Sequence, residues 1–212
     1  MSWNAGHIRD KKISLPKVTD KTRTLVKFMR KTNTNLACVV EWTSKLQAKN
    51  VCAELRRGDN GRVFDFLCTA YFQGQDTNHL LVYDTAFWRP ETFKTSDEKI
   101  TDMELRSRYT HNDALGRLKD AIAWFRTKYP RDKVLVMGDF NCHRNIGQDV
   151  RNLTLHNNLQ LRCPVNPIRP NPIDGIFVSQ QVNAINPLEM TKVTQEHELF
   201  DHSPLGLTLS LN

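Results

Sequence analysis

VLVMGDFNCH, residues 134–143, runs from four apolar residues into a glycine and then into two polar side chains spaced two positions apart. Residues 134–137 are too few for a comfortable helix and predict a short, fully buried strand. Side chains alternate along a strand, so Asp139 and Asn141 would point the same way if the extended conformation continued, with Phe140 turned back toward the core. An ordinary turn also uses Gly, Asp and Asn, and GDFN taken alone favours the turn.

The composition predicts one globular domain, which we expect to cover residues 1–212. The chain has 39% hydrophobic and 25% charged residues, which is typical of a soluble protein with a proper core. It contains no run of about 18 apolar residues and no apolar signal segment at its start, so we expect a cytoplasmic protein without a membrane partner. Five scattered cysteines without a C-x-x-C pair predict reduced thiols rather than disulfides or a zinc site.

The charge balance bears on the class of partner. Thirty Lys and Arg against 23 Asp and Glu give a formal net charge of +7. This surplus favours polyanionic partners, nucleic acid first, although many basic proteins bind no nucleic acid. Nothing in the sequence indicates an obligate protein partner.

Strands and helices alternate along the predicted chain, which indicates an α/β or α+β class with a layered sheet core. Helical periodicity and capping residues predict helices over residues 20–31, from Asn112 or Asp113 to residue 128, and over residues 147–158. Apolar runs predict strands at residues 36–40, 63–72, 79–84, 134–139, 173–179 and 205–211. Acidic residues recur at the strand ends, the edge at which such folds place their chemistry.

Four further stretches make GDFN part of a set. Asn4 follows a tryptophan in WNAG, and Glu41 ends an apolar strand in VVEW. Asp174 opens the strand in PIDGIFVS, and Asp201 and His202 precede the last strand in FDHSPLGLTL. In this order the five pieces resemble the signature of the endonuclease/exonuclease/phosphatase superfamily, the DNase I-like and exonuclease III-like fold. The resemblance runs from residue 3 to residue 211.

This resemblance implies a compact four-layer α/β/β/α sandwich and a metal-dependent phosphodiester hydrolase. Glu41 would be the principal metal ligand, and Asn4 and Asp201 would complete or support the metal and phosphate site. The implied cofactor is Mg²⁺ or Mn²⁺, hard ions for which carboxylate and amide oxygens are suitable ligands.

The resemblance also implies roles for the groups that act on the phosphate. Asp139 would orient or deprotonate the attacking water, and Asn141 would hold a phosphate oxygen. His202, oriented by Asp174, would act as general base or as a cationic stabiliser, and both roles stay open. Phosphodiester hydrolysis needs an activated water and neutralised phosphoryl oxygens, which these residue types can provide.

The chain departs from the family pattern at several positions. The first strand is very short, and Val40 stands where the family has a glutamine. The family's central His or Tyr, which touches the scissile phosphate, has two candidates here, of which we prefer His111 to Tyr109. Trp42, directly after the metal Glu, could fill the core or stack on a base. Basic and polar candidates for substrate contacts lie just beyond predicted strand ends: His7, Arg9 and Arg144.

We therefore expect a Mg²⁺-dependent endonuclease that hydrolyses nucleic acid, with DNA preferred over RNA as the partner. One alternative is a phosphatase or phosphodiesterase acting on a small or lipid phosphoester, because the superfamily's fold and core residues do not decide the substrate. The other is a non-catalytic nucleic-acid-binding module on the same fold.

Overall fold

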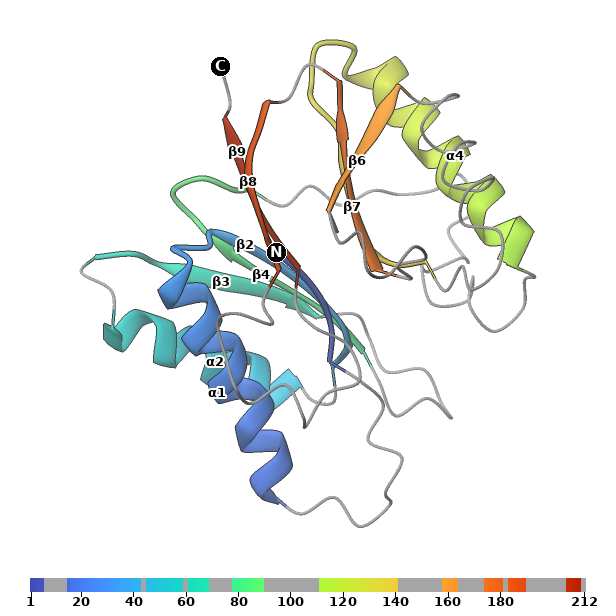
Figure 1. Cartoon of the computed structure of the whole chain (residues 1–212). Helices are drawn as coiled ribbons and strands as arrows, with labels where there is room; N and C mark the ends of the chain where they lie inside the picture. The colour runs from blue at the N-terminus through green and yellow to red at the C-terminus, as the bar shows by residue number, and fades with distance from the viewer. Residues whose placement is uncertain are drawn as a thin grey trace. The chain divides into compact units, whose positions relative to one another are not determined.

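The computed structural model (Figure 1) describes ten segments of the chain: residues 1–5, 15–42, 45–58, 61–68, 78–89, 111–140, 158–163, 174–180, 183–189 and 205–210. The chain divides into two compact units. The first unit comprises Met1–Arg89, Met137–Asp139 and Leu188–Gly206, and the second comprises Pro90–Val136, Phe140–Pro187 and Leu207–Asn212.

A six-stranded sheet with the order β3-β4-β2-β1-β9-β8 forms the larger of two sheets. Its strands are β1 (Ser2–Asn4), β2 (Leu36–Trp42), β3 (Phe64–Cys68), β4 (Asn78–Asp84), β8 (Asn183–Glu189) and β9 (Leu205–Ser210). β1 and β2 are parallel, whereas the pairs β1–β9, β2–β4 and β3–β4 are antiparallel. The predicted strands at residues 63–72 and 79–84 therefore form the expected pair, and the first strand is short, as expected.

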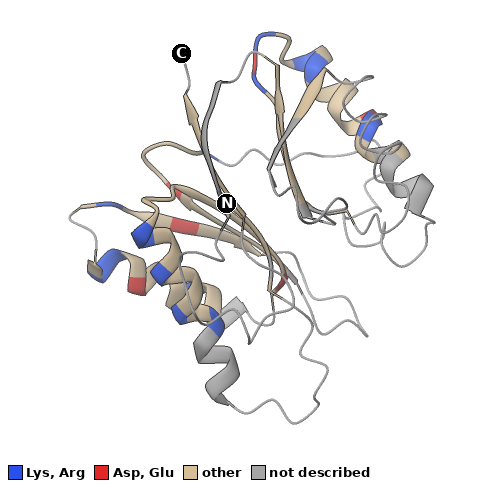
Figure 2. Ribbon diagram, in the orientation of Figure 1, with Lys and Arg blue, Asp and Glu red and all other residues tan. Residues whose placement is uncertain are grey.

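Two helices cover one face of this sheet (Figure 1), α1 (Leu15–Lys31) and α2 (Lys45–Gly58). α2 buries four side chains at the spacing i, i+3, i+4, i+7, which forms one apolar stripe against the sheet: Ala48, Val51, Cys52 and Leu55. α1 does the same with Leu25, Phe28 and Met29. Lys and Arg residues occur along the described parts of both helices (Figure 2). The predicted helix over residues 20–31 is confirmed and begins five residues earlier, whereas α2 was not expected.

The second unit contains one described helix and most of a smaller sheet, in which Met137–Asp139 belong to the first unit. The sheet has the order β5-β7-β6, from β5 (Leu135–Asp139), β6 (Leu159–Cys163) and β7 (Asp174–Ser179). α4 (His111–Lys128) packs on it through Ile122, which shares a core with Leu159 and Phe177. Phe140 turns toward this core as predicted, with its ring centroid 5.0 Å from that of Phe177.

The boundaries differ modestly from expectation. α4 begins at His111, one residue before the predicted caps, and the strands predicted at residues 134–139, 173–179 and 205–211 are present. β6 and β8 were not expected. The predicted helix over residues 147–158 lies almost wholly outside the described residues. In the described part of the chain, no helix is both long and apolar enough to span a membrane.

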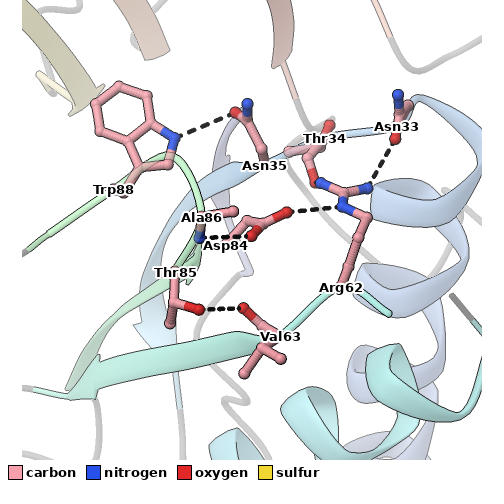
Figure 3. A network of polar contacts seen from close by, with 9 residues as sticks. All are labelled: Asn33, Thr34, Asn35, Arg62, Val63, Asp84, Thr85, Ala86 and Trp88. Atoms are coloured by element: carbon pink, nitrogen blue, oxygen red, sulfur yellow. Dashed lines mark hydrogen bonds and ion pairs between the residues drawn. The ribbon is translucent and has the colours of Figure 1, made fainter. Parts of the chain in front are cut away.

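A buried carboxylate joins the start of β3 to the end of β4 (Figure 3). Asp84 is fully buried and accepts hydrogen bonds from the Arg62 Nε at 2.7 Å and from the Ala86 backbone N–H at 2.9 Å. Arg62 also donates to the Asn33 Oδ1 at 2.7 Å and lies over the ring of Phe64. A charge taken fully out of water is tolerated only when its partners stay in place, so this arginine stabilises the fold.

Replacing Arg62 with methionine should therefore lower the free energy of unfolding by about 3 kcal/mol, because it leaves the Asp84 carboxylate buried without its cation. The matched control is Arg57→Met, since the Arg57–Glu54 pair is exposed and should contribute less than about 1 kcal/mol. Urea denaturation followed by circular dichroism measures both variants. Equal losses in the two variants would contradict the assignment.

Two ionisable side chains of the first unit, the Cys52 thiol and the Tyr83 hydroxyl, have raised pKa values. Burial and the neighbouring Asp65 carboxylate raise the pKa of Cys52 from its ordinary 9.0 to about 11, with Arg56 opposing them. Burial also raises the pKa of Tyr83, together with Asp65, which accepts a hydrogen bond from its hydroxyl at 3.4 Å. Between about pH 9 and pH 11 the folded chain therefore keeps the Cys52 proton that the unfolded chain releases.

The free energy of unfolding should therefore be unaffected by Cys52 below about pH 9 and fall by roughly 2 kcal/mol as the pH rises to about 11. In Cys52→Val the fall over this range should be smaller, because only the Tyr83 contribution of the two remains. Urea titrations at pH 8, 9.5 and 10.5 test this. Parallel pH profiles for the two proteins would show that Cys52 does not keep its proton.

Candidate functional site

The parallel pairing of β1 with β2 brings two of the predicted site residues to one edge of the larger sheet. The register places Asn4 opposite Val40, and the Ala5 N–H donates to the Val40 carbonyl at 3.0 Å, so the pairing continues to the end of β1. Glu41 is the next residue along β2. The backbones of Asn4 and Glu41 thus lie at or near the carboxyl ends of neighbouring parallel strands.

Glu41 itself has an unusual backbone conformation. Its φ is +58°, in the left-handed region that non-glycine residues rarely adopt. The pairing of β2 with β4 shifts at this point: Val39 lies opposite Leu80 and Trp42 opposite Asn78, so β2 carries one extra residue. This is a β-bulge, a feature that concentrates next to active sites because it re-aims a side chain.

The bulge determines which side chains of β2 enter the core. Strict alternation would place Glu41 on the same face as Ala37 and Val39, which belong to the core beneath α1 and α2. The extra residue instead gives that position to Trp42, which is fully buried in this core. Glu41 remains partly exposed. Of the two roles considered for Trp42, the structure therefore supports core packing.

Three other predicted site residues lie at the ends of described elements. Asp139 is the last residue of β5 and belongs to the first unit together with Asn4 and Glu41. Asp174 is the first residue of β7, and His111 is the first residue of α4; both belong to the second unit. Asp139 at the end of β5 and Asp174 at the start of β7 agree with the expectation that acidic residues occur at strand ends.

The remaining predicted site residues lie outside the described residues, so their roles stay predictions. These are Asn141, Asp201, His202, His7, Arg9, Tyr109 and Arg144.

The residue types near the ends of β1 and β2 are compatible with a divalent metal. A carboxylate from Glu41 and an amide from Asn4 are oxygen donors of the kind that Mg²⁺ prefers, and a magnesium ion needs few protein ligands because it keeps several waters. Within the segments that the structure describes, no group of three or more His, Cys, Asp and Glu residues is close enough to hold a metal. Asp201, the other predicted ligand, is outside those segments.

Comparison with known proteins identifies the fold. No family model and no curated protein matches the sequence. Among solved structures, an endonuclease/exonuclease/phosphatase from Bacteroides vulgatus aligns with a TM-score of 0.70 at 14% identity, over 100% of this chain and 97% of that one. The chain has the endonuclease/exonuclease/phosphatase fold. The expected DNase I-like fold and its α/β class are thereby confirmed.

Other solved structures that align with this chain are named for different activities. Bacteroides thetaiotaomicron mannosyl-6-phosphatase aligns with a TM-score of 0.64 at 13% identity, over 99% of this chain and 98% of that one. An AP endonuclease from Archaeoglobus fulgidus aligns with a TM-score of 0.61 at 12% identity, with the same coverage. At these identities the likeness establishes the endonuclease/exonuclease/phosphatase fold and leaves the substrate to this chain's own residues.

The left-handed backbone of Glu41 is the site feature that sequence reasoning missed. A signal for it was present, because an unbroken β2 would have put a carboxylate beside Ala37 and Val39 in the core. A lone buried charge is expensive, so the pattern V-V-E-W is compatible with a core tryptophan only if the strand is interrupted. The bulge resolves that conflict.

The cost of this conformation can be measured by comparing glycine and alanine at one position. At φ +58° glycine is unstrained and alanine is not, so Glu41→Gly should be more stable than Glu41→Ala by about 1 kcal/mol. Asp65, an exposed residue inside β3 with ordinary backbone dihedrals, serves as control: there Gly should be less stable than Ala by about 0.5–1 kcal/mol. Urea denaturation of the four variants decides, and the same sign at both positions would refute the bulge.

Proposed function

We propose that this chain is a metal-dependent phosphodiesterase that cleaves DNA. The observation that carries the proposal is the strained Glu41 beside Asn4 at the carboxyl edge of β1 and β2, in a chain with the endonuclease/exonuclease/phosphatase fold. Strain of this kind costs about 1–3 kcal/mol and persists where the surroundings over-determine it, which is typical of functional sites.

The donor groups divide into those that hold a metal and those that act on the phosphate. We assign Glu41, Asn4 and Asp201 to the metal, which when bound would neutralise charge on a phosphoryl oxygen. Asp139 orients the attacking water or accepts its proton. His202, held in one tautomer by Asp174, acts at the phosphate as base or as cation.

The remaining predicted residues are assigned to substrate binding. Asn141 holds a phosphate oxygen, and His111, which begins α4, or Tyr109 touches the scissile group. His7, Arg9 and Arg144 contact the flanking phosphates. Cationic and amide groups of this kind stabilise the charge that develops as the phosphorus–oxygen bond breaks.

The chain's charge favours nucleic acid as the class of substrate, and we propose DNA as that nucleic acid. A net charge of +7 attracts a polyanion, and the proposed contacts at Arg9 and Arg144 add cations beside the site. The similarity to an AP endonuclease supports a nucleic-acid substrate, whereas the similarity to mannosyl-6-phosphatase supports a phosphomonoester as the second candidate. The two substrates can be distinguished by assay.

Purified protein should nick supercoiled plasmid at low salt in Mg²⁺ or Mn²⁺ and not in EDTA. Glu41→Gln should lose most of this activity because it removes a carboxylate ligand while keeping the size of the side chain. Glu54→Gln, the same change on the outer side of α2, is the matched control and should nick at close to the wild-type rate. His202→Ala should lose about 10²–10⁴-fold, the usual contribution of a general acid or base.

Three outcomes would contradict the proposal. Folded protein that hydrolyses p-nitrophenyl phosphate and leaves plasmid intact would replace the nuclease with a phosphomonoesterase. Folded protein inactive on both substrates would overturn phosphoester hydrolysis. Nicking that survives both Glu41→Gln and His202→Ala would show that the site is misassigned or that the activity is a contaminant.

A further inference from the structure

The chain's positive charge is concentrated on two helices. α1 and α2 together carry ten Lys and Arg against two acidic residues, a net charge of +8. The rest of the chain carries 20 basic and 21 acidic residues, a net charge of −1. The excess that gives the whole protein its charge of +7 therefore lies in 31 residues of α1 and α2.

Most of the described cations on the two helices are exposed, whereas Lys21 is buried. On α1 the exposed Arg23, Lys27 and Lys31 are spaced four residues apart, so they form a stripe along one helix face. On α2 the exposed cations are Lys49, Arg56 and Arg57. We call these six residues the α1–α2 basic face. Figure 2 shows the cations along the described parts of both helices.

The two stripes belong to one surface because the helices pack side by side. The Arg30 guanidinium of α1 donates to the Glu54 carbonyl of α2, which ties the last turns of the two helices together. Neighbouring packed helices lie about 8–10 Å apart, so the two stripes are close enough for one ligand to contact both. Glu54 is the one acidic side chain described on either helix, and it is paired with Arg57 at 2.9 Å.

The apolar and aromatic side chains of α1 and α2 indicate which kind of polyanion the basic face suits. A helix that binds a membrane surface inserts apolar side chains, but the apolar stripes of α1 and α2 are buried in the core. The large hydrophobic side chains exposed in the described segments are Val63, Leu67, Phe87 and Trp124, none of them on these helices. Single-stranded nucleic acid is bound through aromatic stacking, and the one described aromatic residue of α1 and α2, Phe28, is buried.

We infer that the α1–α2 basic face binds the phosphate backbone of duplex nucleic acid, as a second contact surface of the protein besides the edge at Asn4 and Glu41. A duplex presents two phosphate strands at high charge density, which suits two parallel stripes of cations without base-reading groups. The inference concerns binding alone and does not depend on the proposed cleavage. Binding of this kind is independent of sequence and depends steeply on salt.

The test compares two triple variants with the same change in net charge. Lys27→Gln/Lys31→Gln/Lys49→Gln removes three cations from the basic face. Arg89→Gln/Lys128→Gln/Arg131→Gln removes three exposed cations from elsewhere in the chain. Fluorescence anisotropy of a labelled 20-base-pair DNA duplex, measured in EDTA from 50 to 300 mM salt, reports binding without cleavage, and circular dichroism checks folding.

We expect the face variant to bind at least about tenfold more weakly at 100 mM salt and to lower the salt slope by about 2–3, since each phosphate contact contributes about 0.9. The control variant should lose much less duplex affinity, and its salt slope should fall much less. Equal losses in the two variants, or no loss in the face variant, would overturn the inference. Loss of binding to phosphatidylserine vesicles with unchanged duplex binding would also overturn it and identify a membrane as the occupant.

The binding assay also separates this inference from the proposed activity. Wild-type protein that binds the duplex through the basic face but does not nick plasmid would refute the nuclease and support the binding surface. Wild-type protein that nicks plasmid, with identical duplex affinity in wild type and face variant, would support the nuclease and refute the binding surface.

Discussion

The parallel pairing of β1 with β2 is the constraint on which the rest of the first unit depends. β1 is only three residues long, yet it lies between β2 and β9 in the sheet and buries Trp3 beneath the helices. Two parallel neighbours cannot be joined by a tight turn, so the chain between them must cross over the sheet, and α1 makes this crossover. The same pairing sets Asn4 beside Val40 and therefore next to Glu41.

Packing and chemistry make opposing demands at the end of β2. The core beneath α1 and α2 contains the fully buried Trp42, whereas the proposed site at the sheet edge requires a carboxylate that remains partly accessible. Strict alternation cannot satisfy both with this sequence. One extra residue in a left-handed conformation satisfies both, at a cost in backbone strain that the tryptophan's burial offsets.

The sequence predicted an element correctly where a periodic apolar run adjoined a recognisable motif, and it missed elements that had neither. GDFN after four apolar residues predicted β5 with Asp139 at its end, and the five motifs in order predicted the fold. α2 was missed because two residues of its apolar stripe, Ala48 and Cys52, are small and its other positions are strongly basic, so the stripe is weak in sequence. β8 was missed because its strand, NAINPLE, contains a proline and little alternation. The bulge depends on pairing with β4, which a single strand's pattern does not contain.

The distribution of charge bears on two requirements of the proposed nuclease. Carboxylates at a catalytic edge repel the phosphate backbone they must approach, and here the chain outside α1 and α2 is slightly acidic. Cations placed in the reacting groups' immediate surroundings would compete with a metal for those carboxylates. Cations on the outer side of α1 and α2 avoid this competition, because they attract a polyanion over the range of the Debye length, about 10 Å at 0.1 M salt, without touching the donors.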